Sequence, residues 1–150
     1  MRFISHTAEV HEYLDAVRAQ KQSVGLVPTM GYLHDGHISL VERSTAENDI
    51  TMATIFVNPL QFGEKEDLST YPRDLQSDKE RCEAAGTDIL FAPSLEEMYP
   101  TPILTSVHVD GLTTTMEGTT RPTHFTGVAT VVAKLFNIAG PCNAYFGEKD

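Results

Sequence analysis

Two histidines flank a glycine in the segment His34-Asp35-Gly36-His37. A short apolar run precedes this segment and a helical pattern follows it, which predicts a turn from a strand into a helix. A helix that begins near Gly36 presents unpaired backbone N–H groups and the positive end of its dipole. Two imidazoles three residues apart lie on one side of the first turn, where their N–H groups can donate to phosphate oxygens. The segment therefore predicts a phosphate site suited to a triphosphate.

The same histidine spacing has two other interpretations. His-x-x-His can be half of a metal site, although the sequence offers no third ligand spaced as in a metalloprotease. Both histidines can also be polar residues that cap a turn. Gly31 and Gly36 allow the backbone to approach a ligand closely, and together with the preceding buried strand they favour the phosphate interpretation.

Two further polar segments follow apolar runs. Asn58 and Gln61 carry neutral amides, which suit a substrate with hydroxyl and carboxylate groups, but an Asn-Pro turn with a solvent-facing Gln is equally consistent. Lys149 lies between Glu148 and Asp150. The ammonium group can stabilise phosphoryl charge and a carboxylate can bind a ribose hydroxyl, whereas the alternative is a charged surface turn.

The elements that must position these residues alternate between strands and helices. Continuous apolar runs predict buried strands over 24–27, 50–57, 88–92 and 144–146, with a further short strand over 107–109. Helical periodicity predicts helices over 6–20, about 36–47, 74–85 and 124–139, and a single turn over 94–98. This alternation is typical of an α/β domain with a mostly parallel sheet.

The polar segments 29–37, 58–61 and 147–150 each follow a predicted strand. In a parallel sheet the carboxyl ends of the strands meet at one edge, and ligands bind beyond that edge. We therefore expect the three segments to converge on one site.

Composition limits the classes of function. The chain has 150 residues and a formal net charge of −10, so a single domain is expected and general binding to nucleic acid or anionic membranes is disfavoured. Its two cysteines, Cys82 and Cys142, exclude a disulfide scaffold as the organising principle. Neither a membrane-length apolar run nor a signal-peptide pattern occurs, and a cytoplasmic location is expected.

The ordered motifs of the chain resemble the pantoate–β-alanine ligase family. That family belongs to a wider nucleotidylyltransferase group whose shared mark is His-x-Gly-His. The matching segments run in family order over residues 28–37, 55–62, 71–73, 91–93, 98–100, 117–118, 121–128 and 146–150. The resemblance implies a Rossmann-like, doubly wound domain over residues 1–150.

The resemblance also implies a reaction. The carboxylate of (R)-pantoate attacks the α-phosphorus of ATP to give pantoyl adenylate and pyrophosphate. The amine of β-alanine then attacks the acyl carbon to give pantothenate, a step toward coenzyme A, and AMP. Mg²⁺ accompanies ATP as co-substrate, no tightly bound organic cofactor is implied, and the family suggests a homodimer.

Matching positions imply the roles of individual residues. His34, His37 and Lys149 would be catalytic, with His37 as the general acid. Tyr71 and His124 would support the site, and Asp78 is a weak candidate for contact with Mg²⁺, with no firm metal ligand implied. ATP would be bound by Met30, Gly31, Tyr32, Leu33, His34, Asp35, Gly36, His37, Gly147, Glu148, Lys149 and Asp150. Pantoate or β-alanine would be bound by Gln61, Asn58, Thr29, Val131 and Val132.

Members of the family continue past the last matched motif. They add a further glutamine for pantoate, a Ser-Ser-Arg segment and a smaller C-terminal domain, none of which lies within 150 residues. We therefore expect this chain alone to turn over feebly or not at all. Two alternatives stay open, namely a different nucleotidylyltransferase and a non-catalytic nucleotide-binding module.

Overall fold

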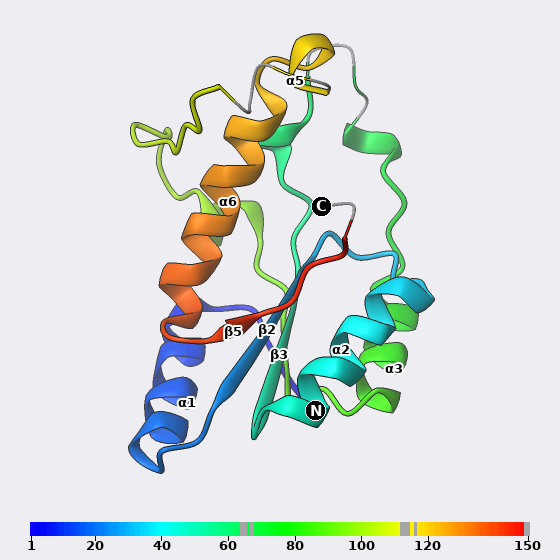
Figure 1. Cartoon of the computed structure of the whole chain (residues 1–150), viewed down its shortest axis with the longest axis vertical. Helices are drawn as coiled ribbons and strands as arrows, with labels where there is room; N and C mark the ends of the chain where they lie inside the picture. Colours follow the sequence, from blue (N-terminus) through cyan, green and yellow to red (C-terminus); the bar gives the residue numbers. More distant parts are fainter. Residues whose placement is uncertain (64–65, 67, 112–114, 116, 149–150) are drawn as a thin grey trace.

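The fold is organised by one parallel sheet (Figure 1). A computed structural model describes residues 1–63, 66, 68–111, 115 and 117–148. Its five strands have the order β1-β4-β3-β2-β5, and all the pairings between them are parallel. The strands are β1 (Arg2–Ile4), β2 (Val24–Thr29), β3 (Ile50–Ile55), β4 (Ile89–Phe91) and β5 (Asn143–Ala144).

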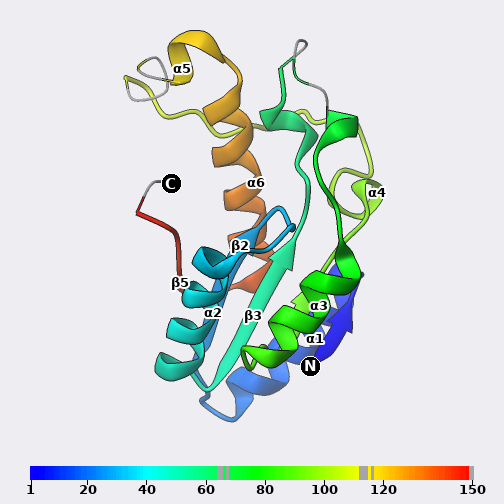
Figure 2. The ribbon, with the colours of Figure 1, turned by 90° about the vertical axis from the view of Figure 1, so that its right-hand side faces the viewer.

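Helices cover both faces of the sheet. The helices α1 (Thr7–Ala19) and α6 (His124–Ala139) lie side by side on one face, and α2 (Asp35–Glu47) and α3 (Leu75–Ala84) lie on the other (Figures 1 and 2). The shorter elements are η1 (Pro59–Gln61), η2 (Leu68–Thr70), α4 (Leu95–Met98) and α5 (Glu117–Thr120). None of the helices described is both long and apolar enough to cross a bilayer. The predicted Rossmann-like, doubly wound α/β fold is confirmed.

Successive residues of β3 build a different core layer on each face of the sheet. Met52 is fully buried in the cluster beneath α1 and α6, whereas Ala53 is buried in the cluster beneath α2 and α3. Side chains alternate along a strand, so a strand covered on both sides must be apolar at nearly every position. Cys82 belongs to the second cluster, and burial raises the pKa of its thiol to about 11.

The clearest differences from the sequence prediction concern three short strands. The predicted strand over 107–109 does not form, because this segment is exposed and the Val107 N–H donates to Thr130 Oγ1 instead of a strand carbonyl. β1 was not predicted, since three residues are too short to show a period, yet Ile4 is buried and paired with Phe91. β5 ends earlier than the predicted 144–146.

The order in which the chain adds strands to the sheet reverses at β2. The chain passes from β2 through α2 to β3 on one side, and it returns through α6 to β5 on the other side. The strand order therefore has a topological switch point beside β2, which is where α/β sheets bind ligands. This arrangement places the segments after β2, β3 and β5 at one end of the sheet.

Candidate active site

The turn after β2 is held in an unusual backbone conformation. Thr29 Oγ1 donates to the carbonyl of Thr54 over 2.7 Å and accepts the N–H of Gly31 over 3.1 Å. Gly31 then has φ +82° and Tyr32 has φ +53°. A positive φ is uncommon outside glycine, so the surrounding structure must stabilise this turn at Tyr32.

The buried carboxylate of Asp78 supplies that stabilisation from α3. Its Oδ2 accepts the N–H of Tyr32 over 2.8 Å, and its Oδ1 accepts the N–H of Leu33 over 2.7 Å. Consecutive N–H groups around a left-handed residue form an anion-binding nest, which Asp78 fills from within the protein. The side chain is only 3% exposed. This geometry favours a role for Asp78 in holding the turn over contact with Mg²⁺.

The two histidines cap α2 reciprocally. His34 Nδ1 accepts the N–H of Gly36 over 3.1 Å, and His37 Nδ1 accepts the N–H of His34 over 3.3 Å. The two ring centroids are 4.1 Å apart. Because both Nδ1 atoms accept, each neutral ring carries its proton on Nε2, the nitrogen that can donate to a phosphate oxygen. The predicted pairing of the rings is thus observed, but the Gly36 amide already donates to His34.

Gln61 lies beside this turn, across the ends of two adjacent strands. Its Nε2 donates to Met30 Sδ over 3.0 Å, which links η1 directly to the segment after β2. Gln61 is 9% exposed. The convergence predicted for segments 29–37 and 58–61 is therefore observed.

Asn58 positions Gln61 from beneath. Its Nδ2 donates to Gln61 Oε1 over 3.2 Å and to the carbonyl of Gly127 over 3.0 Å. Its Oδ1 accepts from the hydroxyl of Tyr99 over 2.9 Å and from the N–H of Leu60 over 3.3 Å. All four hydrogen-bonding positions of this amide are used within the protein, which favours support over direct substrate contact.

Helix α6 approaches η1 at a glycine. A Cβ placed on Gly127 would lie 2.3 Å from the carbonyl oxygen of Leu60, so only glycine allows this contact. The carbonyl of Gln61 accepts from His124 Nδ1 over 2.9 Å and from Arg121 Nη2 over 3.2 Å. His124, predicted as supporting, thus fixes the backbone of Gln61 from the first turn of α6.

The remaining predicted residues make apolar contacts. Val131 is 7% exposed within the core cluster beneath α6, and Val132 is half-buried against that cluster. Tyr71 packs its ring edge-to-face on Phe62 at 5.8 Å. No described contact shows Val131 facing a ligand cavity, and its role in binding stays a prediction.

Tyr99 was missed by the residue-based predictions. Its hydroxyl donates to Asn58, and burial raises its pKa to about 12, which keeps the donor protonated. Residues 98–100 match a segment of the family, but nothing in the local sequence indicates that the Tyr99 hydroxyl bonds to Asn58.

A cavity of about 290 Å³ opens along the carboxyl ends of the strands. The turn after β2 and the ends of β3 and β4 form its walls, which include Met30, Tyr32, Phe56, Arg73 and Asp78. The histidine pair and Gln61 lie outside this lining. Among the residues described, no group of three or more His, Cys, Asp or Glu could hold a metal ion.

The segment after β5 reaches the same end of the sheet. The N–H of Tyr145, the residue after β5, donates to the carbonyl of Leu26 in β2 over 2.9 Å, and Gly147 and Glu148 follow shortly after it in the chain. Lys149 and Asp150, predicted to contact the nucleotide, lie outside the described residues.

With this geometry in view, comparisons with known proteins identify the family. The family profile of pantoate–beta-alanine ligase matches residues 2–150. The chain belongs to the pantoate–beta-alanine ligase family. A pantothenate synthetase of Allorhizobium ampelinum is 59% identical over the whole chain and one of Brucella ovis is 55% identical. The chain spans 52% and 51% of these two relatives, which is about half of their length.

Solved structures of the pantoate–beta-alanine ligase family share the fold. Pantothenate synthetase from Thermus thermophilus superposes with a TM-score of 0.92 at 54% identity, covering 99% of this chain and 52% of that one. The ligase from Francisella tularensis, solved in complex with β-γ ATP and β-alanine, gives a TM-score of 0.93 at 40% identity. That match covers 99% of this chain and 57% of the other.

Proposed function

We propose that residues 1–150 form the nucleotide- and pantoate-binding domain of an enzyme that condenses (R)-pantoate with β-alanine. The enzyme forms pantoyl adenylate and pyrophosphate from pantoate and ATP. It then transfers the pantoyl group to β-alanine and releases pantothenate and AMP. The Francisella relative, named as a complex with β-γ ATP and β-alanine, supports these two substrates.

One observation carries the proposal beyond family membership. The hydrogen bond from Gln61 to Met30 Sδ, 3.0 Å long, joins the neutral amide expected to bind pantoate to the turn that begins the histidine cap. Adenylation requires a carboxylate and a polyphosphate to be held together, which is costly unless donors compensate their charges. A neutral amide donor bonded to the turn that leads into two imidazole donors meets that requirement and aligns the reactants.

The proposed roles follow from this arrangement. The Nε2–H groups of His34 and His37 donate to ATP phosphate oxygens, and His37 is the general acid as pyrophosphate leaves. Lys149 stabilises charge at the α-phosphate, and Gln61 binds pantoate and then β-alanine. Mg²⁺ arrives with ATP, since Mg²⁺ at such sites is bound largely by phosphates and water and neutralises phosphate charge.

A coupled assay of AMP release tests the reaction. The protein expressed from its complete reading frame is expected to release AMP only when pantoate, β-alanine and ATP are all present. Pantoate and ATP alone should give pyrophosphate exchange. Pyrophosphate release with another acceptor and none with pantoate would instead establish a different nucleotidylyltransferase. ATP binding without any turnover would establish a non-catalytic module.

We further propose a cytoplasmic homodimer. Support for association comes from the extended segment 100–110, on which Leu104 is 96% exposed and Val107 and Val109 are 38% and 40% exposed. Contiguous exposed aliphatic side chains commonly mark protein–protein contacts. Light scattering coupled to gel filtration is expected to give twice the mass of one chain, and a monomer at micromolar concentration would contradict the proposal.

A further inference from the structure

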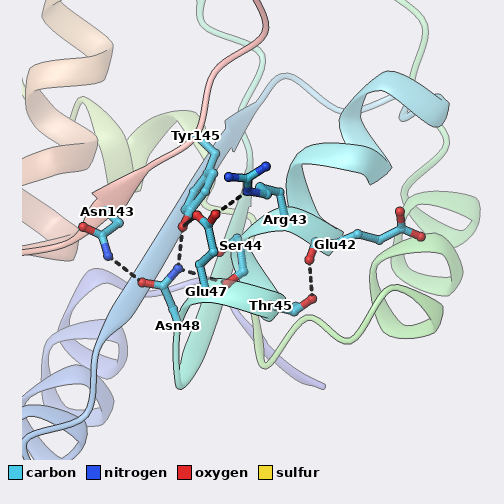
Figure 3. A network of polar contacts seen from close by, with 8 residues as sticks. All are labelled: Glu42, Arg43, Ser44, Thr45, Glu47, Asn48, Asn143 and Tyr145. Carbon is cyan, nitrogen blue, oxygen red and sulfur yellow. Dashed lines mark hydrogen bonds and ion pairs between the residues drawn. The ribbon is translucent and has the colours of Figure 1, made fainter.

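A polar network ties the last strand to the far end of α2 (Figure 3). The hydroxyl of Tyr145 donates to Glu47 Oε2 over 2.8 Å and accepts from Asn48 Nδ2 over 2.7 Å. Glu47 also pairs with Arg43 one turn earlier. Tyr145 and Arg43 both hold the pKa of the Glu47 carboxyl below its usual range, with the tyrosine hydrogen bond as the larger cause. A charged acceptor strengthens the hydroxyl bond.

Asn143 provides a second side-chain contact from β5 to the end of α2. Its Nδ2 donates to Asn48 Oδ1 over 2.8 Å, and Asn48 is the C-terminal cap of α2. Residues two apart on a strand face the same way, so Asn143 and Tyr145 both reach the last turn of that helix. Asn48 also donates to the carbonyl of Ser44 over 2.9 Å, which fixes its own amide (Figure 3).

The next residue is held from the opposite face. The ring of Phe146 meets Phe136 of α6 edge-on, with centroids 6.4 Å apart and planes at 87°. β5 itself pairs only at Asn143 and Ala144, and the N–H of Tyr145 adds one bond to the carbonyl of Leu26 over 2.9 Å. Side chains therefore supply much of what fixes the chain at the point where it leaves the sheet.

Helix α2 thereby connects the two parts of the proposed nucleotide site. Its first turn is built by His34 and His37, and its last turn holds Tyr145. The segment of Gly147 and Glu148 begins two residues after that tyrosine. The same helix therefore positions both the histidine pair and the chain that follows Tyr145.

We propose that the Tyr145 hydroxyl, bound between Glu47 and Asn48, is a positioning site that sets Gly147 and Glu148 relative to the histidine pair. Tyr145 touches no substrate and acts through Gly147 and Glu148, which we place on the nucleotide. The inference rests on the proposed function. It predicts that loss of the hydroxyl weakens ATP binding and leaves the pantoate side unchanged.

The test compares single-atom variants in the protein expressed from its complete reading frame. Tyr145→Phe keeps the ring against the core beneath α2 but removes both hydroxyl bonds. We expect its Kd for ATP, measured by calorimetry, to rise about tenfold, the effect of losing a hydrogen bond to a charged group. KM for pantoate should stay within about twofold, and the fall in melting temperature should be small because Glu47 is exposed.

Four further variants complete the test. Tyr13→Phe on α1 removes the same atom far from the site and should leave Kd unchanged. Glu47→Ala should weaken ATP binding as Tyr145→Phe does, and the double variant should lose no more than either single one. Glu47→Gln keeps an acceptor oxygen and should restore most of the affinity. Glu47 is exposed, so its variants remain informative even if Tyr145→Phe does not fold.

The outcomes separate the two proposals. A parent protein that makes no pantothenate defeats the proposed function. A parent that makes pantothenate, with an unchanged Kd for ATP in Tyr145→Phe and Glu47→Ala, overturns the positioning role. The role is also overturned if Tyr145→Phe raises KM for pantoate as many-fold as it raises Kd for ATP and also lowers the melting temperature strongly, because such a result indicates a merely structural contact.

Discussion

The turn that carries the histidine pair and the region that carries Gln61 are adjacent, but they are built differently. The first is mostly local, since His34, Gly36 and His37 bond to one another within four residues. The second is assembled from distant segments, because Asn58 bonds to Gly127 69 residues away and to Tyr99 41 residues away. A local motif can be found in a sequence, whereas an assembled site depends on the fold that brings its parts together.

Removing one imidazole is expected to give the largest effect, and it should fall on the nucleotide side alone. His37→Ala should lower kcat/KM by about 10²- to 10³-fold, the scale of losing one electrostatic donor in a transition state. KM for pantoate should change little, because Gln61 bonds to Met30 and not to the helix cap. Steady-state kinetics on the complete enzyme measure both quantities, and near-parental kcat/KM would refute the assigned role.

Substitution of Gly127 tests the assembled side. Gly127→Ala places a methyl group 2.3 Å from a backbone oxygen, so α6 or η1 must shift. We expect about 3 kcal/mol of lost stability, as for severe overpacking. KM for pantoate should rise while Kd for ATP stays near that of the parent.

Chemical denaturation and calorimetry provide these measurements for Gly127→Ala. Ala129→Gly is a suitable control on the same helix, since it perturbs helix propensity without entering η1. Equal losses in ATP and pantoate binding would show that the two regions are not separable.

Asp78 makes the long-range contact in the turn after β2, since it bonds to Tyr32, 46 residues away, while the other bonds of the turn are mostly local. Asp78→Asn replaces one acceptor oxygen with a donor that faces a backbone N–H, which leaves a buried group unpaired. The expected cost is about 2 kcal/mol of stability, together with weaker ATP binding. Calorimetry with ATP in the presence and absence of Mg²⁺ separates holding the turn from contact with the metal. A loss seen only with Mg²⁺ would contradict the assignment to the turn.

The smallest effect is expected outside both regions, at the start of α1. Glu97 Oε1 accepts the N–H of Thr7 over 2.8 Å, and Oε2 contacts His6 Nδ1 at 3.1 Å. These bonds, the Thr7 backbone bond first, lower the pKa of Glu97 from 4.5 to about 2. A lowered pKa stabilises the fold above pH 4.5, and this contribution is lost as the pH falls toward 2.

Thermal melts across this pH range check the contribution of Glu97. Glu97→Gln should melt below the parent at pH 7, and the difference should shrink steadily from pH 4.5 to about 2. Neither ATP nor pantoate binding should change at pH 7. A difference that is constant with pH would show that the carboxylate charge contributes nothing.

The sequence predicted the parts of the fold that repeat a strong pattern. The helix over 124–139 has the bounds that periodicity and the Gly140-Pro141 stop indicated. The strand over 107–109 was wrong, because a short β-branched run is also compatible with an exposed extended segment. β1 was missed because its pairing with β4 is a tertiary contact that three residues cannot reveal.

In the candidate site, too, local contacts could be predicted from the sequence and long-range contacts could not. The histidine pair was predicted because its spacing alone places both rings on one turn. Asp78 and Tyr99 were not assigned their contacts, since their partners lie 46 and 41 residues away. The close approach at Gly127 has no sequence signature beyond a glycine inside a helix.

The reciprocal histidine cap has a consequence for the interpretation of mutants. Each ring accepts a backbone N–H at the start of α2 through Nδ1, and the proposed function assigns its Nε2–H to a phosphate, so helix capping and ligand recognition depend on the same two residues. An alanine at either position removes a ligand contact and also frays a helix. His34→Asn would keep an acceptor near the place of Nδ1 and lose only the Nε2–H donor. The difference between the two substitutions measures how far recognition and folding share the same atoms.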